Sequence, residues 1–227
     1  MSAGRGLFVT ATDTGVGKTV VTAGLALVLV ARGHQPAVMK PVQTGNLADD
    51  PAGDTMVLER WTGLPVANVY AFEPPVAPLV AARAAGRAIE LEPILERAEA
   101  LARPLLVEGA GGLLVPVGEG WTIADLAREL GFPLLVVARA GLGTVNHTAL
   151  TIRVARAEGL EPAGVVLNEH GCPPDPSWET NAGLIEELAG VPVLGRVASI
   201  EGDLTSERLR EAVERLDLAP LLARLES

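Results

Sequence analysis

A loop of ten residues, TATDTGVGKT at positions 10–19, constrains this chain more than any other feature. It follows the apolar run Gly6 to Thr10 and leads into Lys18 to Arg32, a segment rich in Ala, Val and Leu that favours a helix. Where a loop joins a strand to a helix in this way, its backbone N–H groups and the helix dipole can hold an anion. The stretch therefore predicts a phosphate-binding loop.

The residue types within this loop indicate how a nucleotide would bind. Its glycines allow a phosphate to approach the backbone closely, Lys18 can reach the outer phosphates, and the Thr19 hydroxyl can ligate Mg²⁺. The residues expected to hold the nucleotide are Thr14, Gly15, Val16, Gly17, Lys18 and Thr19. In the usual motif a glycine stands where this chain has Thr12, so an ordinary strand-to-helix turn with a capping threonine is the alternative.

Strand-like and helix-like segments alternate along the chain. The strand-like segments are short, near-continuous apolar runs, which are typical of strands buried on both faces. They are Gly6 to Thr10, Pro36 to Val42, Pro104 to Glu108, Pro133 to Ala138, Ala163 to Asn168 and Val191 to Gly195. The helical segments are Lys18 to Arg32, Asp54 to Trp61, Leu91 to Ala102, Thr122 to Leu130, Thr144 to Glu158, Trp178 to Leu188 and Ser206 to Leu216. This alternation predicts a single α/β domain over residues 1–227, with a mostly parallel sheet, helices on both faces and a ligand at the carboxyl ends of the strands.

Two acidic residues are candidates for the metal that accompanies a nucleotide. Glu108 ends the apolar run Pro104 to Glu108 and precedes the stretch GAGG, where ligand oxygens could approach the backbone. The alternative for Glu108 is a carboxylate exposed at a strand end. Asp54 begins a predicted helix, so it could cap that helix or turn toward the metal, and both interpretations stay open. The proline-rich segment Glu73 to Leu79 is interpreted as an ordered loop beside the site.

Charge and composition narrow the class of partner. The chain has 18 basic and 28 acidic residues, and its net charge of -10 would repel a nucleic-acid backbone or an anionic membrane surface. The N-terminal stretch MSAGRGLFVTATDTG contains only a short apolar run, too short for a signal peptide or a membrane span. We therefore expect a cytoplasmic protein without nucleic-acid or membrane partners. Only Lys18 and Lys40 are lysines, and the other basic residues are arginines.

Four blocks, TDTGVGKT, KPVQTG, VEGAGG and GLGTVNHTALT, occur in this order and together resemble the dethiobiotin synthetase family from Phe8 to about Asn168. The resemblance implies a P-loop NTPase fold and an ATP- and Mg²⁺-dependent ligase of biotin biosynthesis that acts on 7,8-diaminononanoate and CO₂. One amine would capture CO₂ as a carbamate, which would attack the γ-phosphate, and the second amine would close the ring with release of phosphate. The resemblance also implies a homodimer with the active site near the subunit interface.

The resemblance assigns roles to individual residues. Lys18 and Lys40 match lysines that act on the phosphoryl groups, and Asp54 and Glu108 match magnesium ligands beside Thr19. The positions that match substrate-binding residues are Lys40, Thr44, Gly111, Gly112 and Asn146, and Asn168 matches the residue that reads the adenine edge. Without the resemblance, Asn146 would be an ordinary polar residue in the first turn of a helix, and Asn168 could simply form a turn.

The main alternative is a partitioning or site-placement ATPase of the same phosphate-binding superfamily, a switch protein rather than a biosynthetic enzyme. Such ATPases typically carry K-G-G-x-G-K-T, whose first lysine would fall on Asp13, a residue of opposite charge. Their need to bind DNA or a membrane also conflicts with the net charge of -10. A small-molecule kinase is a further alternative, but it would not need the KPVQTG block.

Overall fold

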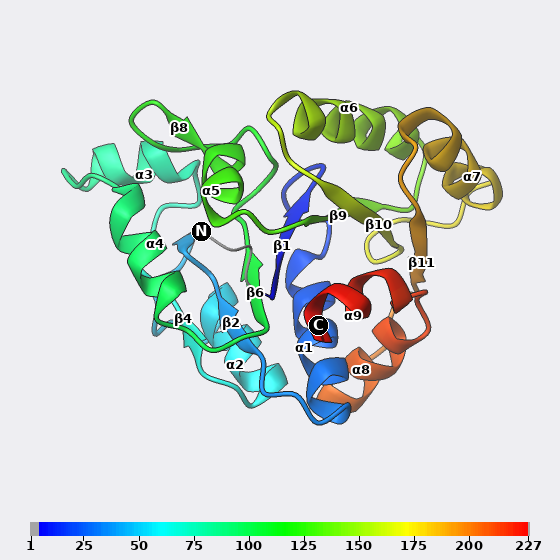
Figure 1. Cartoon of the computed structure of the whole chain (residues 1–227), viewed down its shortest axis with the longest axis horizontal. Helices are drawn as coiled ribbons and strands as arrows, with labels where there is room; N and C mark the ends of the chain where they lie inside the picture. The colour runs from blue at the N-terminus through cyan, green and yellow to red at the C-terminus, as the bar shows by residue number, and fades with distance from the viewer. Residues whose placement is uncertain (1–4, 227) are drawn as a thin grey trace.

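The computed structural model describes residues 5–226, so the first four residues of the N-terminal stretch and the last residue of the chain lie outside the described range. Within that range, seven parallel strands form a sheet in the order β11-β10-β9-β1-β6-β2-β4 (Figure 1). They are β1 (Gly6–Ala11), β2 (Ala37–Met39), β4 (Val66–Ala67), β6 (Leu105–Glu108), β9 (Leu134–Arg139), β10 (Pro162–Asn168) and β11 (Val193–Val197). Two short pairs lie outside this sheet, namely β3 (Val42–Thr44) with β5 (Tyr70–Phe72), and β7 (Pro116–Gly118) with β8 (Trp121–Thr122). The predicted parallel α/β fold is confirmed.

Helices cover both faces of the sheet. One face carries α1 (Lys18–Ala31), α2 (Asp54–Thr62), α8 (Ser206–Glu214) and α9 (Ala219–Glu226). The other face carries α4 (Leu91–Glu99), α5 (Ile123–Leu130), α6 (Thr144–Ala157) and α7 (Trp178–Ala189), while α3 (Pro78–Ala84) packs beside β3 and β7. None of the helices in the described part of the chain is both long and apolar enough to cross a membrane.

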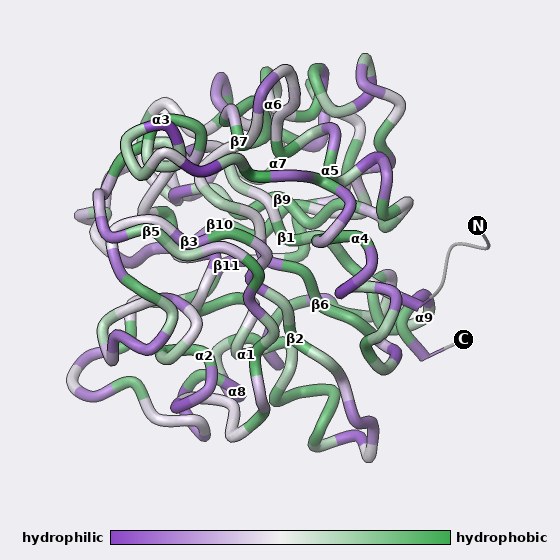
Figure 2. The backbone as a smooth tube through the Cα atoms, turned by 90° about the vertical axis from the view of Figure 1, so that its left-hand side faces the viewer, coloured by the Kyte–Doolittle hydropathy of each residue, from purple (hydrophilic) through white to green (hydrophobic). Residues whose placement is uncertain are grey.

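The central strands are apolar at nearly every position because both of their sides are covered. In β1, Leu7 and Val9 pack on the face of α1, whereas Phe8 packs on the opposite face. Figure 2 shows the same pattern, with hydrophobic residues along the interior strands and many hydrophilic ones in the outer helices and loops. Burial on both faces explains why the strands appear in the sequence as continuous rather than alternating apolar runs.

Some segments differ from the sequence-based prediction. The run Pro36 to Val42, predicted as one strand, is divided, because β2 ends at Met39 and β3 begins a separate pair at Val42. Pro41 lies at the break, where its missing N–H cannot continue a strand ladder. The segment Glu73 to Leu79 is a loop only as far as Ala77, because α3 begins with proline, a residue favoured at the first helical position.

The neighbours of β1 determine where the predicted site residues meet. β6 and β9 flank β1, and β2 lies beside β6, with Val9 opposite Glu108 and Met39 opposite Val107. Because these strands are parallel, the loop after β1, Lys40 after β2 and Glu108 at the end of β6 all lie at the carboxyl edge of the sheet.

Candidate active site

A cavity of about 570 Å³ opens at this carboxyl edge. The sequence-predicted residues that line it are Thr14, Gly15, Gly17, Lys18, Thr19, Lys40, Thr44, Asp54, Glu108 and Gly111. An apolar part of its wall comes from Val42, Val115, the loop residues 75–77 and the first residue of α3, Pro78, which agrees with the expectation that the proline-rich segment lies beside the site. The fold thus brings residues from distant parts of the sequence to one pocket that is both charged and apolar.

Gly17 lies in the predicted phosphate-binding loop and immediately precedes α1. It has φ of +95°, a left-handed conformation that favours glycine, and a Cβ at this position would lie 1.8 Å from Asn168 Nδ2. The first turn of α1 contains no acidic residue. The N–H groups and the dipole at this helix end are therefore well suited to an anion.

Lys18 is buried at the start of α1, and its Nζ donates to the Asp13 carbonyl at 3.5 Å. Burial, and after it the positive charge of Lys40, lowers the pKa of Lys18 to about 8. At neutral pH the ammonium group still carries its proton, so it can bind a phosphate as a cation.

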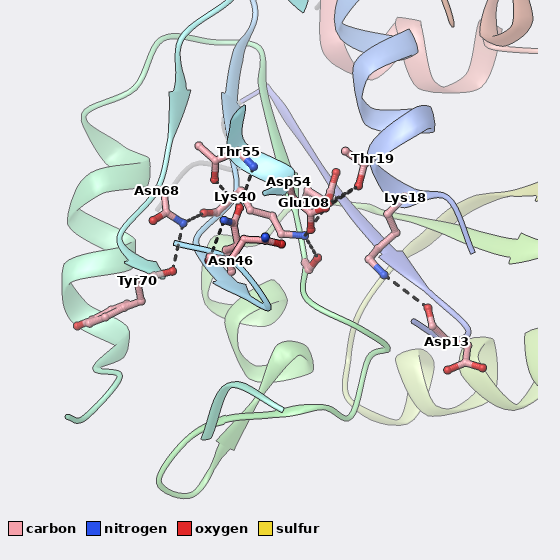
Figure 3. Close-up of polar contacts among 12 residues, drawn as sticks. Asp13, Lys18, Thr19, Lys40, Asn46, Asp54, Thr55, Asn68, Tyr70 and Glu108 are labelled. Atoms are coloured by element: carbon pink, nitrogen blue, oxygen red, sulfur yellow. Dashed lines mark hydrogen bonds and ion pairs between the residues drawn. The ribbon is translucent and has the colours of Figure 1, made fainter. Parts of the chain in front are cut away.

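Lys40 lies at the centre of an ionic cluster (Figure 3). Its Nζ donates to Glu108 Oε1 at 2.6 Å, to Asp54 Oδ2 at 2.7 Å and to the Gly109 carbonyl at 3.2 Å. Burial alone would lower the pKa of Lys40, but the charges of Glu108 and Asp54 outweigh burial and raise it. For Asp54, partial burial alone would raise the pKa, but the charge and hydrogen bond of Lys40 lower it. Lys40 and Asp54 are therefore held in their charged forms.

Thr19 joins the two carboxylates and completes a set of oxygen donors. Its Oγ1 donates to Glu108 Oε1 at 3.1 Å and lies 3.5 Å from Asp54 Oδ1. Glu108 is fully buried, and within the described structure its Oε2 has no hydrogen-bond partner. An unpaired buried carboxylate oxygen beside a hydroxyl and a second carboxylate fits a hard cation such as Mg²⁺. Residues 5–226 contain no group of three or more His, Cys, Asp or Glu side chains able to hold a metal ion.

The side chains decide between the alternatives that the sequence leaves open for the carboxylates. Asp54 is the first residue of α2, which Gly53 caps without a side-chain hydrogen bond, and its carboxylate contacts Lys40 in the cavity. The interpretation of Glu108 as an exposed residue at a strand end is wrong, because its side chain is inaccessible to solvent and bonded to Lys40. Both carboxylates therefore belong to the cavity.

Gln43 and Asn68 position this cluster, and sequence reasoning missed both. The buried Gln43 accepts hydrogen bonds at its Oε1 from Thr55 N at 2.8 Å and Thr55 Oγ1 at 2.9 Å, which fixes the start of α2 and hence Asp54. Asn68 Nδ2 donates to the Lys40 carbonyl at 2.7 Å. The place of Gln43 inside the KPVQTG block is a signal of importance, but its partner twelve residues later cannot be read from the sequence.

Four predicted site residues lie outside this cavity. Val16 packs in the core, and its carbonyl accepts a hydrogen bond at 3.0 Å from the Nδ2 of buried Asn168. Gly112 lines a second groove of about 430 Å³, which lies between the loop after β1 and α6. Asn146 is exposed in the first turn of α6 and lines a third groove of about 520 Å³ between α6 and α7. Within one chain, these residues do not share a pocket with Lys40.

Comparisons with known proteins place the chain in a family. A family model described as an AAA domain matches residues 5–208. The ATP-dependent dethiobiotin synthetase BioD of Bacillus cereus (strain G9842) is 44% identical over 218 residues, which cover 92% of this chain and 89% of that protein. The enzyme of the same name from Bacillus thuringiensis (strain Al Hakam) is 45% identical over 219 residues with the same coverage. A crystal structure of a ParA family ATPase from Chlorobium tepidum TLS, 14% identical, has a TM-score of 0.57 and covers 99% of both chains. That structural likeness shows the fold alone.

Proposed function

This chain belongs to the dethiobiotin synthetase family, and we propose that it carboxylates diaminononanoate with CO₂ and closes the ring with conversion of ATP to ADP and phosphate. The observation that carries the proposal is the 44% identity over 92% of the chain. The single cavity that holds both lysines and both carboxylates supports it. Because the reaction needs ATP, we also propose the cytoplasm as its compartment.

The proposed chemistry asks the protein mainly for positioning and charge neutralisation. One amine of the substrate adds to CO₂ and loses a proton to form a carbamate. A carbamate oxygen then attacks the γ-phosphorus with ADP as the leaving group, and the second amine attacks the carbonyl carbon and expels phosphate. In this proposal Lys18 holds the outer phosphates, while Lys40 neutralises charge on the carbamate and the transferring phosphoryl group. Thr44 and the backbone at Gly111 contact the substrate from the same cavity.

Thr19, Asp54 and Glu108 are the residues proposed to hold Mg²⁺ when a nucleotide binds. The buried, unpaired Oε2 of Glu108 is the observation that supports this set. Mg²⁺ sites commonly combine one or two protein carboxylates with phosphate oxygens of the substrate, and the bound ion neutralises charge on the phosphates.

We propose that the active form is a homodimer that pairs through α6 and α7. Leu142, Leu150, Leu184 and Leu188 are all exposed large apolar residues, and they line the groove that also contains Asn146. Leu150 additionally lines the groove at Gly112. Contiguous exposed apolar surface commonly marks an interface. A second copy on this face would allow Asn146 of one chain to reach the carboxylate of a diamine held beside Gly112 in the other.

The alternative of a partitioning ATPase is weaker. Its support is a fold likeness at 14% identity, whereas family membership rests on 44% identity over most of the chain. At the position where that class carries a lysine, the Asp13 carboxylate accepts a hydrogen bond from Arg139 at 2.9 Å. The side chain at this position therefore has the opposite charge to the lysine of that class.

Phosphate release by the purified protein tests the proposed function. With MgATP, phosphate should appear only when both the diamine and bicarbonate are present, and dethiobiotin should accumulate in equal amount. Phosphate release that is indifferent to the diamine would contradict the proposal. Release stimulated by DNA instead would favour the partitioning ATPase.

A further inference from the structure

The carboxylates that are proposed to hold Mg²⁺ already bind a cation that belongs to the chain. We propose that the Lys40 ammonium is the resident cation of Asp54 and Glu108, and that it disfavours binding of free divalent cations until a nucleotide supplies phosphate ligands. The inference rests on the proposed function only for the identity of the metal ligands. It describes the chain before any nucleotide or diamine binds.

The contacts of Lys40 support this role. Its Nζ bonds one oxygen of each carboxylate, Glu108 Oε1 at 2.6 Å and Asp54 Oδ2 at 2.7 Å, and its third bond goes to the Gly109 carbonyl at 3.2 Å. An ammonium group has three donors, so all of them are used in this arrangement. Lys40 is only 2% exposed and Glu108 is fully buried, so the pairing between these two occurs out of contact with water, whereas the Asp54 side chain is 45% exposed.

The charge balance explains how Lys40 would control metal entry. Asp54, Glu108 and Lys40 together carry a single net negative charge where a divalent cation would bind. The Lys18 ammonium in the same cavity further reduces the attraction for a cation. A cation that approaches the free Glu108 Oε2 would also lie within a few ångströms of the Lys40 ammonium, and like charges repel strongly in such a buried setting. The phosphate oxygens of a bound nucleotide would bring further metal ligands and negative charge to this site. They would therefore favour a divalent cation over the Lys40 ammonium at Asp54 and Glu108.

This arrangement also connects metal entry to the availability of Lys40. When another cation takes over the carboxylates, the Lys40 side chain is free to turn toward a phosphoryl group in the same cavity. Lys18 is not the resident cation in the structure, because its Nζ donates to the Asp13 carbonyl (Figure 3) and, although its charge acts on both carboxylates, it bonds neither of them. The two lysines of the chain therefore have distinct tasks.

Binding of Mn²⁺ to the nucleotide-free protein tests the proposal, with free Mn²⁺ measured by electron paramagnetic resonance. Mn²⁺ suits the same oxygen ligands as Mg²⁺. Lys40→Met removes the resident charge and should tighten Mn²⁺ binding by about tenfold or more relative to wild type. Mn²⁺ should also raise the Tm of Lys40→Met more than that of wild type, because a ligand that binds the folded state stabilises it. No nucleotide or diamine is present, so failure of this test is distinct from failure of the proposed reaction.

Matched variants decide the outcome. Arg97→Met removes one positive charge at an exposed position of α4 and should leave Mn²⁺ affinity at the wild-type value. Adding Asp54→Asn to Lys40→Met should remove the gained affinity. If Lys40→Met does not fold, Lys40→Gln, whose amide can still donate to Glu108, is measured against the same criteria. Unchanged or weaker Mn²⁺ binding in the Lys40 variant, or an equal gain in Arg97→Met, would overturn the proposal.

Discussion

The surroundings of Lys40 and the outer surface of α6 both contain predicted substrate contacts, but they are built in opposite ways. Lys40 and Glu108 are buried, and a bond of 2.6 Å joins them within the chain. Asn146 is exposed on α6 beside Leu142, which is 84% exposed. In the first region the carboxylates are paired with Lys40 inside the fold, whereas the second region presents polar and apolar side chains at the surface. In the proposed function, a single chain therefore preorganises the phosphoryl chemistry, while the proposed α6 contact would depend on a second copy of the chain.

The largest effect is expected from Glu108→Gln in the first region. Turnover should fall by about a thousandfold, because a proposed metal ligand and the main partner of Lys40 are lost together. The free energy of unfolding should fall by about 3 kcal/mol, since buried Lys40 loses its fully buried partner and keeps only the half-exposed Asp54. Steady-state kinetics and urea unfolding measure the two quantities.

Glu119→Gln is the matched control for this change. Glu119 is exposed and pairs with Arg83 on the surface, so its substitution should alter neither quantity measurably. Wild-type stability of Glu108→Gln would show that the Lys40 cluster is not the preorganised element described here.

A moderate effect is expected from Asn146→Ala in the second region. The KM for the diamine should rise by about tenfold with little change in kcat, because the lost contact would stabilise the bound substrate and the transition state equally. Mixing this variant with Lys40→Met should restore activity at low diamine, since each mixed dimer would contain one intact site. A mixture no more active than its components would place both residues in the site of one chain.

The smallest effect is expected at Asp125, a solvent-accessible carboxylate that provides a contrast to the Lys40 cluster. Burial alone would raise the pKa of Asp125, but hydrogen bonds from Thr122 N and Oγ1 at 2.8 Å, and pairing with Arg128, lower it. Asp125→Asn should cost about 1 kcal/mol at neutral pH, as loss of a helix cap does.

The pH dependence of this cost follows from the lowered pKa. The difference in stability between wild type and Asp125→Asn should be present above about pH 4, the ordinary pKa of an aspartate. It should disappear as pH falls through the lower pKa of the folded protein. Thermal unfolding of both proteins across this pH range measures the difference. The activity of Asp125→Asn at neutral pH should equal that of wild type. A difference that persists at lower pH would contradict the assignment.

Much of the fold could be predicted because burial on both faces marks its strands. β1, β6, β9 and β10 appear in the sequence as apolar runs, and the glycine-bearing loop fixes how β1 joins α1. The break at Pro41 and the very short strands could not be predicted, because they depend on which neighbours pair rather than on local pattern. Pro78 occupies the first position of α3, where proline is favoured, but the neighbouring prolines made the whole segment look like a loop.

The candidate site was predictable in its residue types and not in its contacts. Lys18, Thr19 and Glu108 follow from motifs at strand ends, and the structure brings them to one cavity. That Lys40 bonds both Asp54 and Glu108 could not be inferred, because this depends on the order of β2, β6 and β1 in the sheet. The anchoring of α2 by Gln43 is equally a consequence of tertiary structure.

In the proposed mechanism, the compact ammonium of Lys40 acts on the transfer step from a buried position. The most direct measurement is the single-turnover rate of phosphoryl transfer in Lys40→Arg, taken together with its dissociation constant for ATP. Arginine keeps the positive charge, but its planar guanidinium is larger and less mobile than the compact ammonium of lysine and cannot take the same position. We expect the rate to be about a hundredfold lower, with nearly unchanged ATP affinity. A wild-type rate, or a loss confined to ATP affinity, would contradict it.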